Sequence, residues 1–344
     1  MTTILFEDLN LFWFLTLGVL LMGYAVLDGF DFGVGIMHLF VNDDHERRVL
    51  MNSIGPLWDG NEVWLVTFGG ALFAAFPEAY ATAFSGYYLA FVLLLFALIF
   101  RAVSLEFRSK SQWRPWRRFW DVSFCVASTV AALLFGVAVG GSMGGIPIGA
   151  DREYAGNFFN LLTPYALLVG VFTVSLFAMH GSIYLYLKTE GDLQARIKGW
   201  IWVTYGIFLA IYLVTTIVTL VAVPNAIRNF GDYPWAWGVA FLNFLAIANI
   251  PRALYHGNPG YAFISSCCTI AAFVFLFGIS LFPNIITSSI DSEYSLTIYN
   301  AASSQKTLFI MQICAFLGMP FVLAYTAVIY WVFRGKVELG QFSY

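Results

Sequence analysis

Long apolar runs, separated by short polar connections, make up most of the chain. A helix needs roughly 20 mainly apolar residues to cross about 30 Å of hydrocarbon. By this criterion the sequence predicts an all-α membrane protein, a single integral membrane domain over residues 1–344 with about nine transmembrane helices. The predicted spans lie near residues 10–36, 57–77, 83–105, 119–142, 161–187, 199–223, 235–254, 261–282 and 307–333. Two four-helix units plus one extra helix would account for this number, although the sequence alone does not demonstrate a repeat.

Composition supports a membrane environment. Hydrophobic residues make up 60% of the 344 positions and charged residues only 11%, whereas about 25% of an average soluble domain is charged. A soluble fold of this length would need more charge to cover its surface, so lipid must cover much of the apolar excess. The net charge of −3 is too small to indicate nucleic-acid binding.

The basic residues predict the orientation of the chain, because Lys and Arg near the ends of spans favour the cytoplasm. Fourteen of the 17 basic residues lie beside the connections after the first, third, fifth and seventh spans or in the C-terminal tail. Only Arg152, Arg228 and Lys306 fall on the other side. The N-terminus is therefore predicted outside and the C-terminus in the cytoplasm, which requires an odd number of spans.

Two acidic residues interrupt the first predicted helix. Asp28 would lie about 26 Å along this helix, close to its cytoplasmic end, if the helix begins near residue 11. Asp28 and Asp31 share one side of the helix because they are three residues apart. Gly29 and Gly33 are four residues apart and would let another helix approach closely. The two carboxylates are therefore expected beside a helix contact and not in lipid.

Two further acids and one arginine fall at a similar predicted depth. Asp59 and Glu62 lie one helical turn apart at the start of the second span, with Trp58 and Trp64 on either side. Arg101 follows the long apolar run of the third span. With the two acids of the first helix, these charges are all expected in the inner third of the membrane.

This shared depth has two interpretations. Because a carboxylate at the bilayer centre costs about 2.5–3.5 kcal/mol, intramembrane acids persist where they pair, line a watery cavity or carry protons. The functional interpretation is a proton-conducting polar pocket open to the cytoplasm. The alternative is that the first helix stops at Asp28 and that the acids are solvated among headgroups, with Arg101 as their counter-ion.

Histidine and cysteine give no sign of a cofactor site. His180 is the one histidine inside a predicted span, and no second histidine lies at a matching depth to complete the axial ligands of a b-type haem. It is interpreted as a hydrogen-bonded core residue. The cysteines lack metal-ligand spacing and are expected to be buried small hydrophobic residues. They are Cys125, Cys267, Cys268 and Cys314. No catalytic residue and no metal site is assigned to this chain.

Several runs of the sequence resemble subunit II of cytochrome bd-type quinol oxidases, from the first predicted helix to the last. These are residues 28–35 (DGFDFGVG), 52–64 (NSIGPLWDGNEVW), 69–75 (GGALFAA), 156–162 (GNFFNLL) and 303–308 (SSQKTL). The element around Trp58 and Trp64 is the most specific of them.

The resemblance implies a function in a bacterial terminal oxidase of aerobic respiration, in the cytoplasmic (inner) membrane. In this family subunit I holds two b-type haems and one d-type haem, oxidises quinol and reduces O2 to water with protons from the cytoplasm. Subunit II binds no haem, packs against subunit I and contributes a proton route. The sequence leaves open whether small single-helix subunits join the complex and whether a structural quinone lies in this subunit.

The resemblance also assigns roles to individual residues. Asp59 matches the proton-channel carboxylate of the family, beside Trp58, and Trp64 matches a tryptophan near the place where O2 enters from the membrane. Asp28, Asp31 and Glu62 are grouped with this proton pathway, and Arg101 is a supporting residue beside it. The terminal Tyr344 resembles a tyrosine near the cytoplasmic end of the route, although an unordered terminus explains it equally well.

Two other functions are weighed against this one. An ion-coupled secondary transporter would use the same acids, but such proteins place broken helices at the midplane in paired repeats, and no paired Gly/Pro interruption is visible here. A purely structural scaffold subunit would need none of the acids. Neutralising the acids separates the scaffold from the proton route, and solute uptake by vesicles that contain this chain alone would support the transporter.

Overall fold

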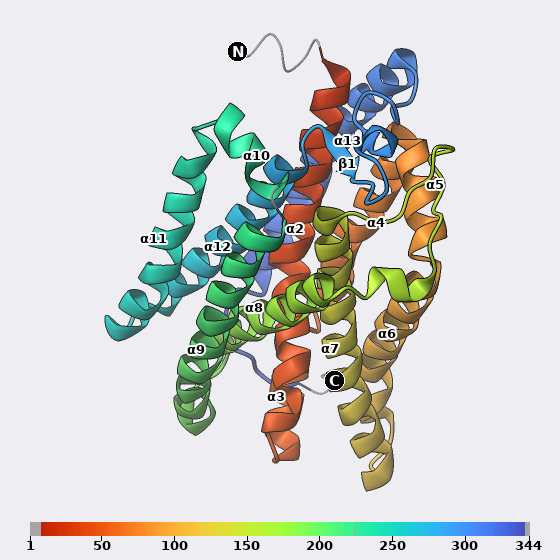
Figure 1. Cartoon of the computed structure of the whole chain (residues 1–344). Helices are drawn as coiled ribbons and strands as arrows, with labels where there is room; N and C mark the ends of the chain where they lie inside the picture. Colours follow the sequence, from red (N-terminus) through yellow and green to blue (C-terminus); the bar gives the residue numbers. More distant parts are fainter. Residues whose placement is uncertain (1–7, 224, 341–344) are drawn as a thin grey trace.

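Helices account for most of the structure, a computed structural model that describes residues 8–223 and 225–340 (Figure 1). Eight helices of this described part are long and apolar enough to cross a membrane. They are α2 (Leu9–Met37), α6 (Tyr88–Phe107), α7 (Arg114–Gly144), α8 (Pro164–Lys188), α9 (Gly191–Ala222), α11 (Ala236–Tyr255), α12 (Pro259–Leu281) and α13 (Gln305–Val332). Each overlaps a predicted span, so the all-α membrane fold is confirmed.

The remaining predicted span, near residues 57–77, corresponds to α4 (Trp58–Ala75). Its 18 residues rise about 27 Å, nearly the thickness of the hydrocarbon core. Asp59, Asn61 and Glu62 make the start of α4 polar, and α4 is not among the eight helices above. The count of nine spans and the orientation across the membrane therefore stay predictions.

Shorter elements connect the long helices. The third predicted span, near residues 83–105, is divided at Tyr87, where α5 ends and α6 begins. The shorter elements are η1 (His38–Phe40), α3 (Asp44–Ile54), α5 (Pro77–Gly86), η2 (Arg108–Lys110), η3 (Phe158–Leu161), α10 (Asn225–Asp232), β1 (Asn284–Ile286), η4 (Ser292–Tyr294) and β2 (Leu296–Thr297). The strands β1 and β2 pair antiparallel in a two-stranded sheet.

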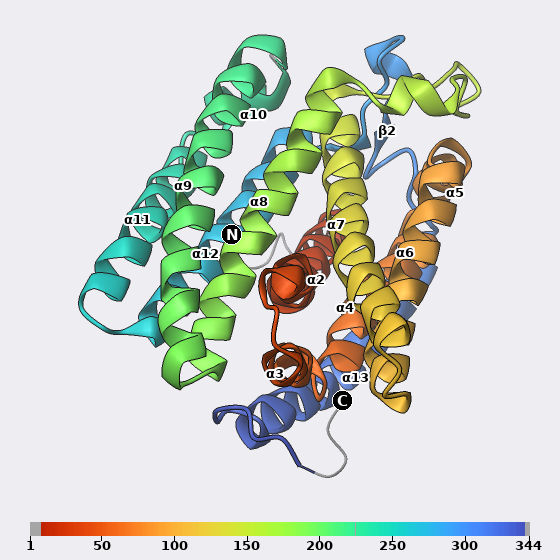
Figure 2. The ribbon, with the colours of Figure 1, turned by 90° about the horizontal axis from the view of Figure 1, so that it is seen from below.

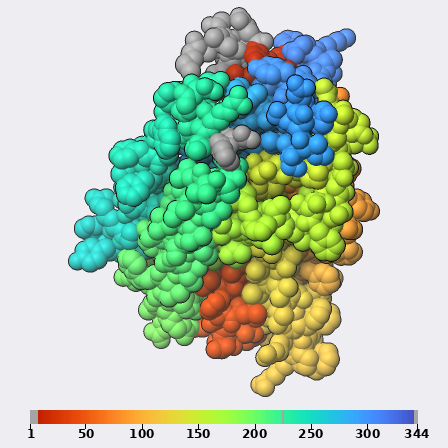
Figure 3. Space-filling view, viewed as in Figure 1, coloured from red at the N-terminus to blue at the C-terminus, as the bar shows by residue number. Residues whose placement is uncertain are grey.

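Helix α2 lies in the middle of the molecule. It contacts α4, α7, α8, α12 and α13, and Figure 2 shows α8 and α9 on one side of it and α4, α6 and α7 on the other. The segment that follows α2, which includes α3, comes to the surface between α9 and α7 (Figure 3). Residues near the end of α2 therefore meet side chains from several distant parts of the sequence.

Gly29 and Gly33 of α2 allow α8 to approach closely, as their spacing predicts. A Cβ atom added to Gly33 would lie 2.0 Å from the carbonyl oxygen of Phe177 and 2.7 Å from the Cα atom of Gly181. A Cβ atom at Gly29 would lie 2.8 Å from the Phe177 ring. The helix continues through both glycines to Met37. Asp28 and Asp31 consequently lie inside a packed helix, and the alternative in which the helix stops at Asp28 is wrong.

The outer helices keep much of their apolar surface exposed. Helices α9 and α13 have few buried residues, while more than half of α8 is buried. In a membrane chain such surface faces lipid or a partner subunit. Cys268 and Cys314 lie on this surface, so the expectation that they are buried is wrong, whereas Cys125 and Cys267 are partly buried. A thiol is apolar enough to face lipid, and hydropathy alone therefore could not separate the two environments.

Candidate functional site

A fully buried ion pair joins α2 to α6. The Nη1 atom of Arg101 donates to Oδ2 of Asp28 at 3.0 Å, and its Nη2 atom donates to Oδ1 of the same carboxylate. Both side chains have no exposed surface. The guanidinium also lies over the ring of Phe32, 4.2 Å from its centroid. Two parallel hydrogen bonds to one carboxylate fix the orientation of the arginine as well as neutralising it.

Glu62 of α4 approaches the same arginine. Its Oε1 atom lies 3.6 Å from Nη2 of Arg101, an ion-pair distance that is too long for a good hydrogen bond. The side chain of Glu62 is 26% exposed, so it links the buried pair to the surface of the chain. One guanidinium therefore faces two carboxylates, one from α2 and one from α4.

Asp31 is fully buried and is held by neutral groups. The Nδ2 atom of Asn61 donates to Oδ2 of Asp31 at 2.8 Å and to the carbonyl of Leu27 at 3.1 Å. The hydroxyl of Tyr330 donates to Oδ1 of Asn61 at 2.9 Å. Within the described part of the chain, Oδ1 of Asp31 has no hydrogen-bond partner. A chain of polar groups thus runs from α13 through α4 to α2.

We name Asp28, Asp31, Glu62 and Arg101 the acid-rich cluster. The sequence predicts that these residues share a depth, and the structure brings them together from α2, α4 and α6. If all three acids were ionised, the cluster would hold two more negative charges than positive ones. Asn61 and Tyr330 also belong to the surroundings of this cluster. They were not predicted, because a neutral polar residue in a helix gives no hydropathy signal that distinguishes it from an ordinary packing residue.

The other predicted site residues have different surroundings. Asp59 lies in the first turn of α4 with an exposed side chain, and Trp58 before it packs beside an apolar cluster near α3. Trp64 is buried, and its indole packs against Gly23 of α2 so closely that no side chain would fit there. Its role in O2 access stays a prediction. Tyr344 lies outside the described residues.

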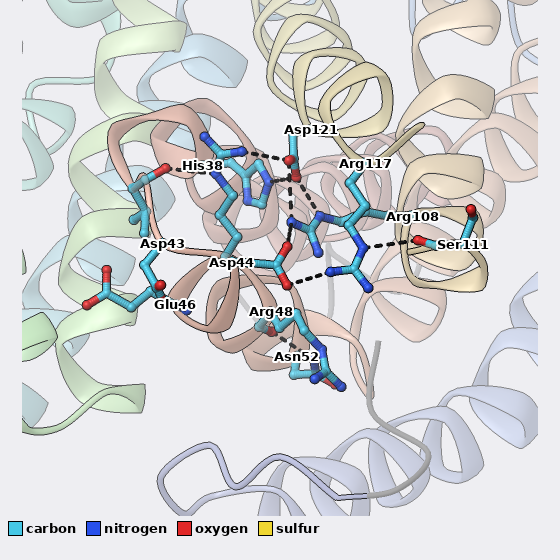
Figure 4. Close-up of polar contacts among 12 residues, drawn as sticks. His38, Asp43, Asp44, Glu46, Arg48, Asn52, Arg108, Ser111, Arg117 and Asp121 are labelled. Carbon is cyan, nitrogen blue, oxygen red and sulfur yellow. Dashed lines mark hydrogen bonds and ion pairs between the residues drawn. The ribbon is translucent and has the colours of Figure 1, made fainter. Parts of the chain in front are cut away.

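A second group of charged residues, which sequence reasoning did not find, lies where α3, α7 and the ends of α2 and α6 meet (Figure 4). Asp121 of α7 is its centre and is almost completely buried. The Nε2 atom of His38 and the Nε atom of Arg108 each lie 2.6 Å from its Oδ1 atom. Nη1 of Arg47 donates to its Oδ2 atom at 2.7 Å.

Asp44 of α3 extends this second group toward the surface. Its Oδ1 atom accepts from Nη2 of Arg108 at 2.8 Å, and its Oδ2 atom accepts from Nη1 of Arg117 at 2.8 Å (Figure 4). The whole group is named the arginine-rich cluster and consists of His38, Asp44, Arg47, Arg108, Arg117 and Asp121. Three arginines surround two carboxylates, so each acid has at least two cationic partners. In the sequence these arginines are recognisable only as markers of orientation.

His180 does not fit the role of a haem ligand. Its Nδ1 atom lies 2.7 Å from Oγ of Ser266, and its Nε2 atom lies 3.0 Å from the carbonyl oxygen of Val26. An axial ligand needs a free ring nitrogen, so the interpretation of His180 as a hydrogen-bonded core residue is confirmed. Across residues 8–223 and 225–340, no three His, Cys, Asp or Glu side chains are grouped so that they could hold a metal ion.

Comparison with known families gives a match over nearly the whole chain. The family model described as "Cytochrome bd terminal oxidase subunit II" matches residues 9–333. The cytochrome bd-I ubiquinol oxidase subunit 2 of Escherichia coli is 38% identical over 365 aligned positions, which cover 96% of this chain and 96% of that protein. The cytochrome bd ubiquinol oxidase subunit 2 of Bacillus subtilis is 37% identical, covering 95% and 96% of the two chains.

The fold also matches a solved structure. A chain of the bd oxidase from Geobacillus thermodenitrificans superposes with a TM-score of 0.78, covering 94% of this chain and 98% of that one. The two sequences are only 17% identical in this superposition. The likeness therefore supports the arrangement of the helices, while the family rests on the sequence matches.

Proposed function

Because the chain belongs to the cytochrome bd terminal oxidase subunit II family, we propose that its acid-rich cluster conducts protons toward the oxygen-reducing centre of the complex. The chain is the second subunit of a quinol oxidase, an oxidoreductase complex of the bacterial inner membrane, and this implies assembly with subunit I. The reduction of O2 to water consumes protons, so a route through the membrane-embedded protein is needed.

We assign the haems of the complex, two b-type and one d-type, to subunit I. Bound there, they supply the electron transfer and the reduction of O2. Both ring nitrogens of His180 make hydrogen bonds and are not free to bind a haem iron, which supports this assignment. The role left for this chain is to hold and move protons.

The observation that carries the proposal is the imbalance of charge around Arg101. Asp28 forms a two-point pair with this arginine, Glu62 lies 3.6 Å from it, and Asp31 is held by the neutral Asn61. One cation can compensate one carboxylate, and burying an uncompensated carboxylate is expensive. The cluster can therefore take up protons without gaining net positive charge, as a proton relay requires.

The order of the relay follows from exposure. Asp59 is exposed at the start of α4, and Glu62 is one turn further along the same helix and partly exposed. Asp28 and Asp31 are fully buried, one turn apart on α2. We propose that protons enter at Asp59, pass to Glu62 and reach the α2 acids, beside which Asn61 and the Tyr330 hydroxyl extend the polar chain.

The test is the substitution Asp59→Asn in the purified two-subunit complex. Oxygen consumption with quinol should fall about tenfold or more, because proton transfer through a positioned group typically contributes 10²–10⁴-fold. The haem absorption per complex should not change. Asp192→Asn is the matched control, since Asp192 is also an exposed acid in the first turn of a helix, α9. Both variants lose the same favourable contact with the helix dipole.

The two alternatives make different predictions for this experiment. Full oxygen consumption in Asp59→Asn and in Glu62→Gln, with intact haem, would leave the subunit as a scaffold and end the proton proposal. The transporter is not favoured by the family match. Solute uptake driven by a proton gradient in vesicles that hold this chain alone would be the result that supports it.

A further inference from the structure

An apolar groove runs along the outside of α6 and α7. Its volume is about 650 Å³. On α6 its wall includes Leu93, Phe96 and Phe100, and on α7 it includes Val122 and Val126. These wall residues are aliphatic or aromatic side chains in the middle of predicted membrane-spanning helices. The groove therefore follows the long axis of the two helices and lies where an acyl chain of the bilayer would lie.

The lining of the groove changes in polarity along α7. Arg118 stands at one end, Ser123 follows five residues later, and the wall beyond is apolar as far as Val130. With the rise of an α-helix, Ser123 lies about 7.5 Å and Val130 about 18 Å from the level of Arg118. A cation, then a hydroxyl, then a long apolar wall is the order of the phosphate, the ester and the acyl chain in a phospholipid.

Arg118 differs from Arg108 and Arg117 in having a free guanidinium. Arg108 and Arg117 are both held by Asp44 in the arginine-rich cluster. Arg118 is exposed and, within the described residues, makes no hydrogen bond or ion pair with a side chain or carbonyl. The hydroxyl of Ser123 likewise has no hydrogen bond in that part of the chain. The polar groups of this groove are thus available to a ligand.

We propose that this groove binds one anionic phospholipid of the leaflet at the Arg118 end, predicted to be the cytoplasmic one. Arg118 binds the phosphate, Ser123 donates to an ester carbonyl, and one acyl chain lies along Phe96, Phe100 and Val126. The charge of the site is complementary to an anionic headgroup, because a cation near the membrane surface attracts anionic lipid. The proposal does not depend on the proton route.

The test uses the complete complex after delipidation in mild detergent, titrated with phosphatidylglycerol and followed by native mass spectrometry. Arg118→Gln should weaken binding of this lipid about fivefold, the factor that one surface cation contributes. Lys198→Gln is the control, because Lys198 is also exposed on the predicted cytoplasmic side but lies outside the groove. It should leave the affinity within about twofold of the wild type.

A second variant tests the groove itself. Val126→Trp fills the apolar wall and should remove the phosphatidylglycerol adduct while subunit I and the haem absorption stay with the complex. Equal binding of phosphatidylcholine and phosphatidylglycerol to the wild type would overturn the assignment of an anionic ligand. Loss of subunit I from Val126→Trp would show that the groove is a protein contact, and it would overturn the proposal as well.

Discussion

Two ion clusters, each built where α2 and α6 meet other helices, hold opposite balances of charge. The acid-rich cluster holds three carboxylates and one cation, Arg101, which pairs with Asp28 and Glu62 while Asp31 has the neutral partner Asn61. In the arginine-rich cluster two carboxylates are shared by three arginines and His38. Arg101 and Arg108 lie seven residues apart on α6 and its short continuation η2, about two helical turns.

The difference between the clusters supports a structural function for the arginine-rich cluster and the proposed proton function for the acid-rich one. Asp121 accepts hydrogen bonds from His38, Arg47 and Arg108, so its negative charge is fully compensated. Each of these three donors depends on the carboxylate being ionised. Asp31 has a neutral partner and one oxygen that makes no hydrogen bond among the described residues. A carboxylate that is buried among excess cations stays ionised and clamps the neighbouring helices together. A group of buried carboxylates with too few cations favours a site that exchanges protons.

The largest effect is expected from Asp121→Asn. This change leaves His38, Arg47 and Arg108 around a neutral side chain, and removing one partner of a buried ion pair costs about 3–5 kcal/mol. We expect a strong loss of assembled complex and a lower temperature of haem release, measured by absorption during heating. Stability equal to that of wild type would contradict the clamp function and would remove the contrast between the two clusters.

Asp28→Asn should cost less stability than Asp121→Asn but should cost more activity. Arg101 keeps Glu62 as a counter-ion at 3.6 Å, so the cost should be about 2 kcal/mol, below that of Asp121→Asn. Oxygen consumption per haem should fall about 100-fold, because a buried acid of the relay is lost. Equal effects on stability and activity would mean that Asp28 serves only to hold α6 against α2.

The sequence predicts the acid-rich cluster better than the arginine-rich one, and the reason is physical. An acid inside an apolar run conflicts with its surroundings, so Asp28 and Asp31 are visible without a structure. Arg47, Arg108 and Arg117 lie near predicted span ends, where basic residues are ordinary markers of orientation. Their acid partners, Asp44 and Asp121, meet them only because α3, α7 and the ends of α2 and α6 come together, and hydropathy does not determine this arrangement.

Most of the long helices were predictable for a similar physical reason. Seven predicted spans agree with the long helices to within a few residues at most ends, because a run of apolar residues must be covered by lipid or protein. The second and third spans were less predictable. Polar residues at the start of α4 and the break at Tyr87 divide this part of the chain in a way that depends on tertiary contacts.

Neutralising one acid in each cluster tests directly whether the charge balance of a cluster decides its function. Asp31→Asn keeps an oxygen that can accept from Asn61, so stability should change by less than about 1 kcal/mol. Oxygen consumption should nevertheless fall about tenfold, since the amide cannot bind the transferred proton. Asp44→Asn is the matched change in the arginine-rich cluster and should leave turnover unchanged. Similar turnover in the two variants would show that the charge balance of a cluster does not decide its function.

The smallest effect is expected from Tyr330→Phe, which removes a single hydroxyl at the edge of the acid-rich cluster. The lost hydrogen bond to Asn61, 2.9 Å long, contributes about 1 kcal/mol to stability. Because Asn61 orients the carboxylate of Asp31, we expect proton uptake by reconstituted vesicles to slow by about two- to fivefold, equivalent to roughly 0.4–1 kcal/mol.

The control for Tyr330→Phe is Tyr325→Phe, on the same helix α13 but with an exposed side chain. It should change neither stability nor proton uptake. If both tyrosine variants slow uptake equally, the effect belongs to the surface of α13 and not to the polar chain. If Tyr330→Phe alone lowers stability without changing uptake, the Asn61 hydrogen bond is structural. The relay would then end at the carboxylates of α2, and α13 would have no part in it.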